Sequence, residues 1–283
     1  MSKGYFAIVQ NNDSVDYLEQ AYYLALSLRA TQSGVNNLSI MIDEPTRKLI
    51  KRKHTKVFDH IVDIPWQDEA QDSEWKINNK WKVYYATPYH ETVLLDTDMV
   101  FPTDVSHWWP IMSQQDFWAT TTVKTFRGQD ITNSKYRLAF VDNDLPNIYS
   151  AFMYFKKSDL ASEIFKLSEH IFHNWQRFYH LYLPKSKPKH VSGDVVFALA
   201  IKILGYEHLT TKQNMNSMPT FVHMKGELQE IPYLDNDWSD RIQSNYAQPD
   251  QLLVGNFLQS YPFHYVDKDW ISNIDTSILS EDK

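Results

Sequence analysis

The stretch Thr92-Val93-Leu94-Leu95-Asp96-Thr97-Asp98-Met99-Val100-Phe101 decides how the chain is expected to fold. Apolar residues lie on both sides of two carboxylates at positions i and i+2, which indicates a buried central strand ending in charged side chains. Burying an ionised carboxylate without a partner costs a prohibitive amount of free energy, so the pair needs a cation. We therefore predict that this strand delivers Asp96 and Asp98 to a divalent metal ion at the edge of a sheet. The alternative is a turn that merely ends a strand.

An Asp-x-Asp triplet on its own is a weak signal in this chain. Three more copies occur, at 142–144, 235–237 and 267–269. None of them has apolar runs on both flanks, so we predict a solvent-exposed turn for each. Only the copy at 96–98 therefore predicts a metal site.

The composition restricts the class of protein. Of the 283 residues, 43% are hydrophobic and 14% aromatic, which predicts an ordered core over most of the length. The net charge of −7 argues against nucleic acid as a partner, and the absence of cysteine excludes disulfides and thiolate metal sites. No apolar run reaches the ~18 residues that a membrane span needs, and no signal peptide precedes the first strand. We expect a soluble, cytoplasmic protein.

Strands and helices alternate along the first part of the chain. We expect strands at 5–9, 38–42 and 57–64 and helices at 15–30 and 46–53. This alternation is typical of a parallel sheet covered by helices, in which ligands bind beyond the carboxyl ends of the strands. The polar turn Gln10-Asn11-Asn12 and the triplet at 96–98 both follow predicted strands, so they are expected to face one crevice.

Further elements follow in the second part of the chain. We expect helices at 77–85 (with Lys80), 158–180 and 195–204, and strands at 117–123, 149–155 and 220–226. Trp108 and Trp109 are expected to lie in the core, and residues 124–147 are expected to form a mobile loop. Ser158 or Asp159 is expected to cap its helix. Asp194 precedes the helix at 195–204, where a helix cap is its structural alternative, and His223 has an ordinary strand-end histidine as its alternative.

Taken in order, these pieces resemble the glycogenin-like, retaining nucleotide-sugar glycosyltransferases of the GT-A fold. The resemblance covers most of residues 4–230. It is carried by the turn 10–13 with Tyr17, the helix end 24–29, Lys80 sixteen residues before Asp96, the strand 149–154, Gly193-Asp194 and His223-Met224-Lys225-Gly226. The chain departs from the family where Tyr149 replaces an Asn and where Glu227-Leu228-Gln229-Glu230 stands in place of Lys-Pro-Trp.

The resemblance implies a fold and a set of roles. The fold is a Rossmann-like α/β domain with a mixed, mostly parallel sheet at residues 1–230, and residues 231–283 form a C-terminal extension packed on it. Metal ligands are Asp96, Asp98 and His223, and Mn²⁺ is expected, with Mg²⁺ as the alternative. The nucleotide is expected to contact Gln10, Asn11, Asn12, Tyr17, Lys80, Thr97, Lys225 and Gly226. The donor sugar is expected to contact Asp96, Ser150, Gly193 and Asp194.

The implied reaction moves a sugar from a nucleoside-diphosphate sugar, expected to be a UDP-sugar, to an acceptor hydroxyl with retention of configuration. In this hexosyltransferase, Lys80 and the metal stabilise the departing diphosphate, and Asp194 orients the sugar or stabilises its oxocarbenium-like centre. The acceptor, whether carbohydrate, lipid or protein, is not predicted.

Two other functions remain open from the sequence. Asp96-x-Asp98-x-Val100 also fits the opening motif of haloacid-dehalogenase-like phosphatases, although that class carries it on the first strand. A non-catalytic module on a glycosyltransferase fold would instead bind a carbohydrate or partner through aromatic residues such as Trp238 and Trp270.

Overall fold

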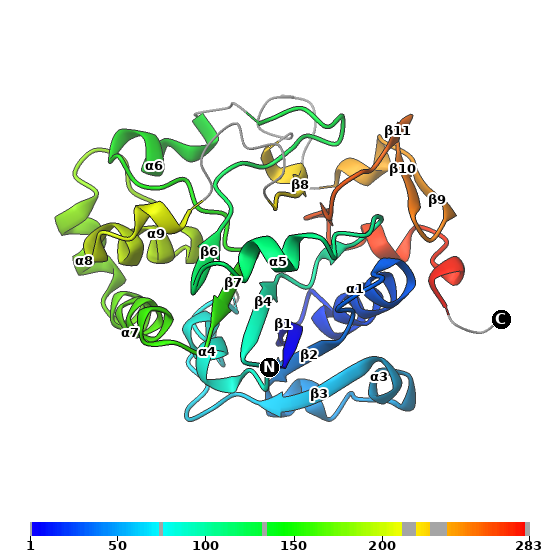
Figure 1. Ribbon diagram of the computed structural model, residues 1–283, viewed down its shortest axis with the longest axis horizontal. Coiled ribbons are helices and arrows are strands. Elements are labelled where there is room, and N and C mark those ends of the chain that lie inside the picture. Colours follow the sequence, from blue (N-terminus) through cyan, green and yellow to red (C-terminus); the bar gives the residue numbers. More distant parts are fainter. Residues whose placement is uncertain (1, 74–75, 132–134, 211–218, 227–236, 281–283) are drawn as a thin grey trace.

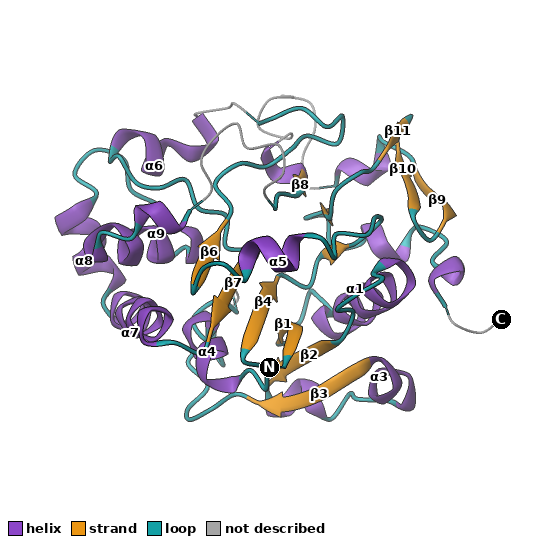
Figure 2. Ribbon diagram, viewed as in Figure 1, coloured by secondary structure: helices purple, strands orange, loops and turns teal. Residues whose placement is uncertain are grey.

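The computed structural model describes residues 2–73, 76–131, 135–210, 219–226 and 237–280. Most of them form one α/β body around a six-stranded sheet (Figures 1 and 2). Among the described residues, no helix has the length and apolar character needed to cross a membrane.

The central sheet is mixed and mostly parallel, as the sequence predicts. Its strand order is β3-β2-β1-β4-β7-β6, and β1 pairs in parallel with both β2 and β4, whereas β7 runs antiparallel to β4 and β6. The strands are β1 (Lys3–Val9), β2 (Leu38–Ile42), β3 (Phe58–Asp63), β4 (Glu91–Leu95), β6 (Phe117–Ala119) and β7 (Phe152–Lys156). The expected fold class is therefore confirmed.

Helices cover both faces of this sheet (Figure 2), which explains why its strands are apolar on both sides. Along β1, Tyr5 and Ala7 join the core on one face, whereas Phe6 joins the core on the other. The first core includes α1 (Tyr17–Thr31), α3 (Arg52–Val57) and α5 (Trp108–Met112). The second includes α4 (Val83–Ala86), α7 (Asp159–His173) and α9 (Gly193–Leu204). Trp108 and Trp109 are buried, as predicted.

A small second sheet joins three distant parts of the chain. Its order is β5-β12-β8, with β5 (Met99–Val100), β12 (Phe263–His264) and β8 (Val222–His223). The middle strand, β12, runs antiparallel to β5 and parallel to β8. A separate antiparallel sheet contains β9 (Ser244–Gln248), β10 (Gln251–Val254) and β11 (Phe257–Leu258). The C-terminal part of the chain thus reaches the strand that follows Asp98 directly.

Several predicted elements have different boundaries in the structure. The helix expected at 158–180 begins after the predicted cap Ser158 but ends at His173, and α8 (Trp175–Tyr182) follows, because Asn174 leaves helical geometry with φ −126°. The helix expected at 46–53 is replaced by α2 (Glu44–Arg47) and α3, because Lys51 between them is extended.

The segment expected to be a mobile loop at 124–147 is partly helical. It holds a 3-10 turn at Lys135–Arg137 and α6 (Leu138–Asp142), and buries Arg137 and Phe140. The loop prediction is therefore wrong for this part.

The other Asp-x-Asp triplets differ in their surroundings. At 142–144, Asp144 is fully solvent-facing, with a side-chain exposure of 98%. The triplet at 267–269 contradicts its prediction, because Asp267 is buried and accepts backbone hydrogen bonds from Ser239 and Asp269. Most of the triplet at 235–237 lies outside the described residues.

Candidate active site

The candidate site lies where the strand order of the central sheet changes direction. From β1 the order runs through β2 to β3 on one side and through β4 on the other. Open α/β sheets bind ligands beyond the carboxyl ends of the strands at such a point. Asp96 follows β4 there and Gln10 follows β1, so the two segments that the sequence places at one crevice do meet at one edge of the sheet.

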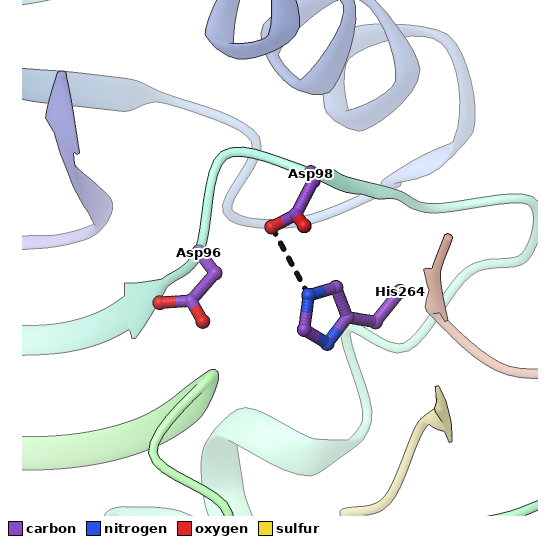
Figure 3. Close-up of side chains that lie close together, drawn as sticks. All are labelled: Asp96, Asp98 and His264. Atoms are coloured by element: carbon purple, nitrogen blue, oxygen red, sulfur yellow. Dashed lines mark ion pairs between the residues drawn. The ribbon is translucent and has the colours of Figure 1, made fainter. Parts of the chain in front are cut away.

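Asp96, Asp98 and His264 bring their ligand atoms together within 4.8 Å of one another (Figure 3). The Nε2 atom of His264 lies 3.0 Å from Oδ1 of Asp98. Backbone hydrogen bonds hold the segments that carry these side chains. Tyr265 N–H donates to the Asp98 carbonyl at 3.1 Å, and Asp96 N–H donates to the Ala151 carbonyl at 3.1 Å. These two carboxylates and one imidazole could together hold a metal ion.

The predicted third ligand, His223, lies behind His264. The two imidazole rings are stacked, with centroids 4.7 Å apart and an interplanar angle of 14°. In the second sheet, His264 pairs with His223 on one side and with Met99 on the other, so β12 stands between His223 and the carboxylates. The structure therefore groups His264 with Asp96 and Asp98, and the role of His223 as a ligand stays a prediction.

A lysine faces each of the two carboxylates. Lys80, which the family resemblance predicted at the site, places Nζ 2.8 Å from Oδ1 of Asp96. Lys268 places Nζ 2.5 Å from Oδ2 of Asp98. Sequence reasoning missed Lys268, because it lies in the triplet that was expected to be a solvated turn.

The charge on Asp98 is strongly stabilised. Burial alone would raise the pKa of this carboxyl, but His264 and Lys268 hold the pKa well below its usual range. Burial likewise opposes the charge on Lys268, yet Asp98 raises the pKa of Lys268 above its ordinary value. Both groups are therefore ionised at neutral pH.

A row of hydrogen bonds connects the carboxylate pair to the N-terminus of α9. Lys80 donates to Oγ of Ser150 at 3.1 Å, and Ser150 donates to Oδ1 of Asp194 through its hydroxyl at 2.7 Å and its backbone N–H at 2.8 Å. Gly193 permits this approach, since a Cβ there would lie 3.2 Å from Ser150 Oγ and 3.4 Å from Lys80 Cδ. The predicted residues Lys80, Asp96, Ser150, Gly193 and Asp194 thus form one continuous group.

Arg137 holds the other oxygen of Asp194 and, like His264 and Lys268, is a functional candidate that sequence reasoning missed. Its Nη1 lies 2.7 Å from Oδ2 of Asp194. The guanidinium carbon lies 3.7 Å from the Phe140 ring centroid and 4.1 Å from that of Tyr149. Burial would raise the pKa of Asp194, but Arg137 and the Ser150 hydrogen bonds keep the pKa well below its ordinary value. Asp194 is therefore a fixed, ionised carboxylate.

Gln10, expected to contact the nucleotide, is buried in a polar cluster. Its amide donates to Oδ2 of Asp43 at 3.3 Å and to Oδ2 of Asp68 at 3.0 Å, and its oxygen accepts from Asn79 at 2.9 Å. This cluster ties the end of β1 to the segment that leads to Lys80. The contact of Gln10 with a nucleotide stays a prediction.

The rest of this turn shapes the start of α1. Asn11 and Asn12 accept backbone N–H groups from residues of the turn and of the first helical turn. Tyr17 follows, half-buried, with its ring centroid 5.4 Å from Nζ of Lys268. Tyr17 therefore lies beside Lys268, and the stacking role expected for it stays a prediction.

The remaining predicted nucleotide contacts are more dispersed. Thr97 is buried and donates to Oε1 of Gln20 at 3.2 Å, so its side chain supports the carboxylate loop from α1. Lys225 is exposed. Gly226 is packed against Ile131, whose Cδ1 would lie 2.4 Å from an added Cβ. These three nucleotide contacts also stay predictions.

Comparisons with known proteins give distant similarity only. No protein-family model matches the sequence, and no curated protein matches it. Among solved structures, the chain is similar to mouse xyloside xylosyltransferase 1 in its apo form, with 12% identity, a TM-score of 0.47, and coverage of 75% of this chain and 84% of that one.

Two further solved structures are also similar to the chain. One is the galactosyltransferase LgtC in complex with donor and acceptor sugar analogues, with 12% identity, a TM-score of 0.46, and coverage of 73% of this chain and 72% of that one. The other is the apo structure of the bifunctional glycosyltransferase WbbM, with 11% identity, a TM-score of 0.37, and coverage of 65% and 38%.

Proposed function

We propose that the protein is a metal-dependent glycosyltransferase of the hexosyltransferase type. It transfers a sugar from a nucleoside-diphosphate sugar, with a UDP-sugar as the first donor to test, to an acceptor hydroxyl with retention of configuration. The observation that supports this most is the continuous row Asp98, Asp96, Lys80, Ser150 and Asp194 at the carboxyl end of β4. Along this row a candidate cation site, a positive charge and a further carboxylate follow one another in space.

The donor set fits a divalent metal ion. Carboxylate oxygens with an imidazole suit Mn²⁺, and Mg²⁺ accepts the oxygens. The Nδ1 atom of His264 is buried and has no hydrogen-bond partner among the described residues, so the ring has no other strong polar role. If held by Asp96, Asp98 and His264, such an ion would supply positive charge that neutralises the negative charge developing on the leaving group.

Lys80 contributes a second positive charge beside the candidate metal site. Its side chain is 8% exposed and is fixed between Asp96 and Ser150. A buried ammonium stabilises an anion more strongly than a solvated one, because less water screens it. We assign to Lys80 the stabilisation of the departing diphosphate, which removes the need for a strong general acid at the leaving group.

Asp194 contributes a negative charge of fixed orientation. Both of its oxygens are engaged, one by Ser150 and the other by Arg137. A carboxylate held in this way accepts hydrogen bonds from sugar hydroxyls without rotating, and it stabilises positive charge developing at the anomeric carbon. We assign to Asp194 the orientation of the donor sugar.

The alternatives fit the site less well. In a phosphatase of the haloacid-dehalogenase type, Asp96 would be the nucleophile, yet it follows β4 instead of the first strand of the chain. A purely carbohydrate-binding module has no need for a partly buried row in which a lysine joins a pair of carboxylates to a third carboxylate. We therefore favour the transferase.

The test is release of UDP from UDP-sugars by metal-stripped protein, measured with and without Mn²⁺. We expect activity only with the metal, and loss of at least two orders of magnitude in Asp98→Asn, as is common when an electrostatic contribution to the transition state is removed. Turnover of a UDP-sugar by Asp98→Asn at the wild-type rate would refute the proposal.

Two parallel assays address the alternatives. Hydrolysis of p-nitrophenyl phosphate without any response to UDP-sugars would favour the phosphatase. Calorimetric binding of glycans without metal, and no binding of UDP with Mn²⁺, would favour the binding module. The anomeric configuration of the product, read by proton NMR, tests retention.

A further inference from the structure

The ammonium of Lys268 lies against Asp98, a proposed metal ligand, at a carboxylate oxygen that could coordinate the metal. Its Nζ lies 2.5 Å from Oδ2 of Asp98, while Oδ1 of the same carboxylate contacts His264. The Asp98 side chain is only 7% exposed. Both oxygens are therefore engaged, and a divalent cation that binds Asp98 through Oδ2 has to displace Lys268.

The position of Lys268 favours such an exchange. Its side chain is 34% exposed, whereas that of Asp98 is nearly buried, so the lysine can move outward and the carboxylate cannot. It follows β12 by four residues, and Gln20 on α1 donates to its carbonyl at 3.4 Å, which holds the backbone while the side chain remains the movable part. The ring of Tyr17 lies 5.4 Å from Nζ, on the side of the turn that follows β1.

We propose that Lys268 is a built-in counter-ion that neutralises Asp98 in the metal-free protein and exchanges with the divalent cation when the site is loaded. The displaced ammonium then remains beside the metal, where it binds the diphosphate of the donor. This inference rests on the proposed function, because it presumes that Asp98 binds a metal. It gives the C-terminal part of the chain a role in donor binding.

The chain contains a matched control for Lys268. Lys53 places Nζ 2.5 Å from Oε2 of Glu19 and 4.4 Å from the ring centroid of Tyr22. It therefore makes the same kind of ion pair over a tyrosine ring, at the junction of α1 and α3 instead of at the carboxylate pair. Replacing it by methionine removes one positive charge without touching Asp98.

The first experiment measures binding of Mn²⁺ alone by calorimetry. Removing a charge-assisted hydrogen bond that competes with the metal corresponds to about a tenfold change in affinity, the lower end of its usual worth. We expect Lys268→Met to bind Mn²⁺ about tenfold more tightly, while Lys53→Met stays at the wild-type value. Lys268→Arg, which keeps the ion pair, should remain near wild type. An unchanged Mn²⁺ affinity in Lys268→Met would overturn the exchange.

A second measurement uses the wild-type protein and so does not depend on the folding of a variant. Lysine acetylation by an activated ester, read by mass spectrometry, should rise severalfold at Lys268 when Mn²⁺ is added and fall again when UDP follows. Reactivity of Lys53 should not change. If Mn²⁺ binds but the reactivity of Lys268 does not rise, the lysine is not displaced and the inference is wrong.

Asp98→Asn separates this inference from the proposed function. If the wild type binds no Mn²⁺, or if Asp98→Asn still binds the Mn²⁺ that the wild type binds, the metal site and the proposed function fail together. If Asp98→Asn abolishes Mn²⁺ binding but both lysine readouts are flat, only the exchange fails.

Discussion

Replacing Arg137 by methionine should reveal how firmly the fold holds Asp194. Arg137 is buried, donates to Asp194 at 2.7 Å and to Asn147 at 2.6 Å, and lies between two aromatic rings. Removing one partner of a buried ion pair costs about 3–5 kcal/mol. The Asp194 side chain is 23% exposed and keeps its hydrogen bonds from Ser150. We therefore expect the loss in unfolding free energy to lie at the lower end of this range, about 3 kcal/mol.

Urea denaturation at pH 7 measures this cost. Arg127→Met is the matched control, since Arg127 lies in the same segment over the ring of Phe126 at 4.8 Å but is exposed. We expect the control to cost less than about 0.5 kcal/mol. The double variant Arg137→Met with Asp194→Asn should recover part of the loss, because it removes the charge that was left unpaired.

The pH dependence of the free energy of unfolding provides an independent test of the pairing between Arg137 and Asp194. In the wild type the pKa of Asp194 is below its unfolded value of about 3.9, so its stabilising contribution is present above that pH and is lost as the pH falls through the lower folded value. Without Arg137, burial raises the folded pKa, and the variant is destabilised more as pH rises. The difference between wild type and Arg137→Met should therefore narrow from pH 7 to pH 4.5. A cost below 1 kcal/mol, or a difference that does not change with pH, would refute this reasoning.

Two further substitutions test other parts of the structure. His264→Ala should weaken Mn²⁺ binding, measured by calorimetry, by roughly 10–100-fold or more, as when the partners of a metal site are removed. His223→Ala should weaken it less. If His223→Ala instead weakens Mn²⁺ binding more than His264→Ala does, His223 is the ligand. Gly4→Ala should cost about 1–3 kcal/mol in urea denaturation, because its Cβ would lie 2.3 Å from the Tyr89 ring and 2.5 Å from Nδ2 of Asn37; a cost near zero would mean that β1 shifts freely.

The sequence predicted the parts of the fold that local patterns encode. Apolar runs identified β1, β2 and β4, and the carboxylates after β4 were placed correctly at the end of the strand. The family resemblance pointed to Lys80, sixteen residues before Asp96, and the two side chains do meet at 2.8 Å. These residues are close in sequence or lie on adjacent strands, so the pattern determines their geometry.

The rest of the site comes from contacts between remote segments. Arg137 lay in a polar stretch without periodicity, and only its tertiary contacts with Tyr149 and Asp194 make it a buried cation. His264 and Lys268 approach Asp98 through the pairing of β12 with β5, which no local pattern announces. A polar residue whose partner lies on a distant segment looks the same as a solvated one.

The insertion of β12 between β5 and β8 has a consequence for synthesis of the protein. During translation, the six strands of the central sheet are complete by Lys156, whereas His264 and Lys268, which contact the Asp98 carboxylate, emerge more than 100 residues later. Pairings between such remote segments form late in folding because the intervening chain must first be closed into a loop. A chain terminated before β12 would thus retain the carboxylate loop but lose His264 and Lys268. The ribosome must reach residues 264 and 268 before the proposed metal centre can assemble, so translation products that end before them are expected to be inactive.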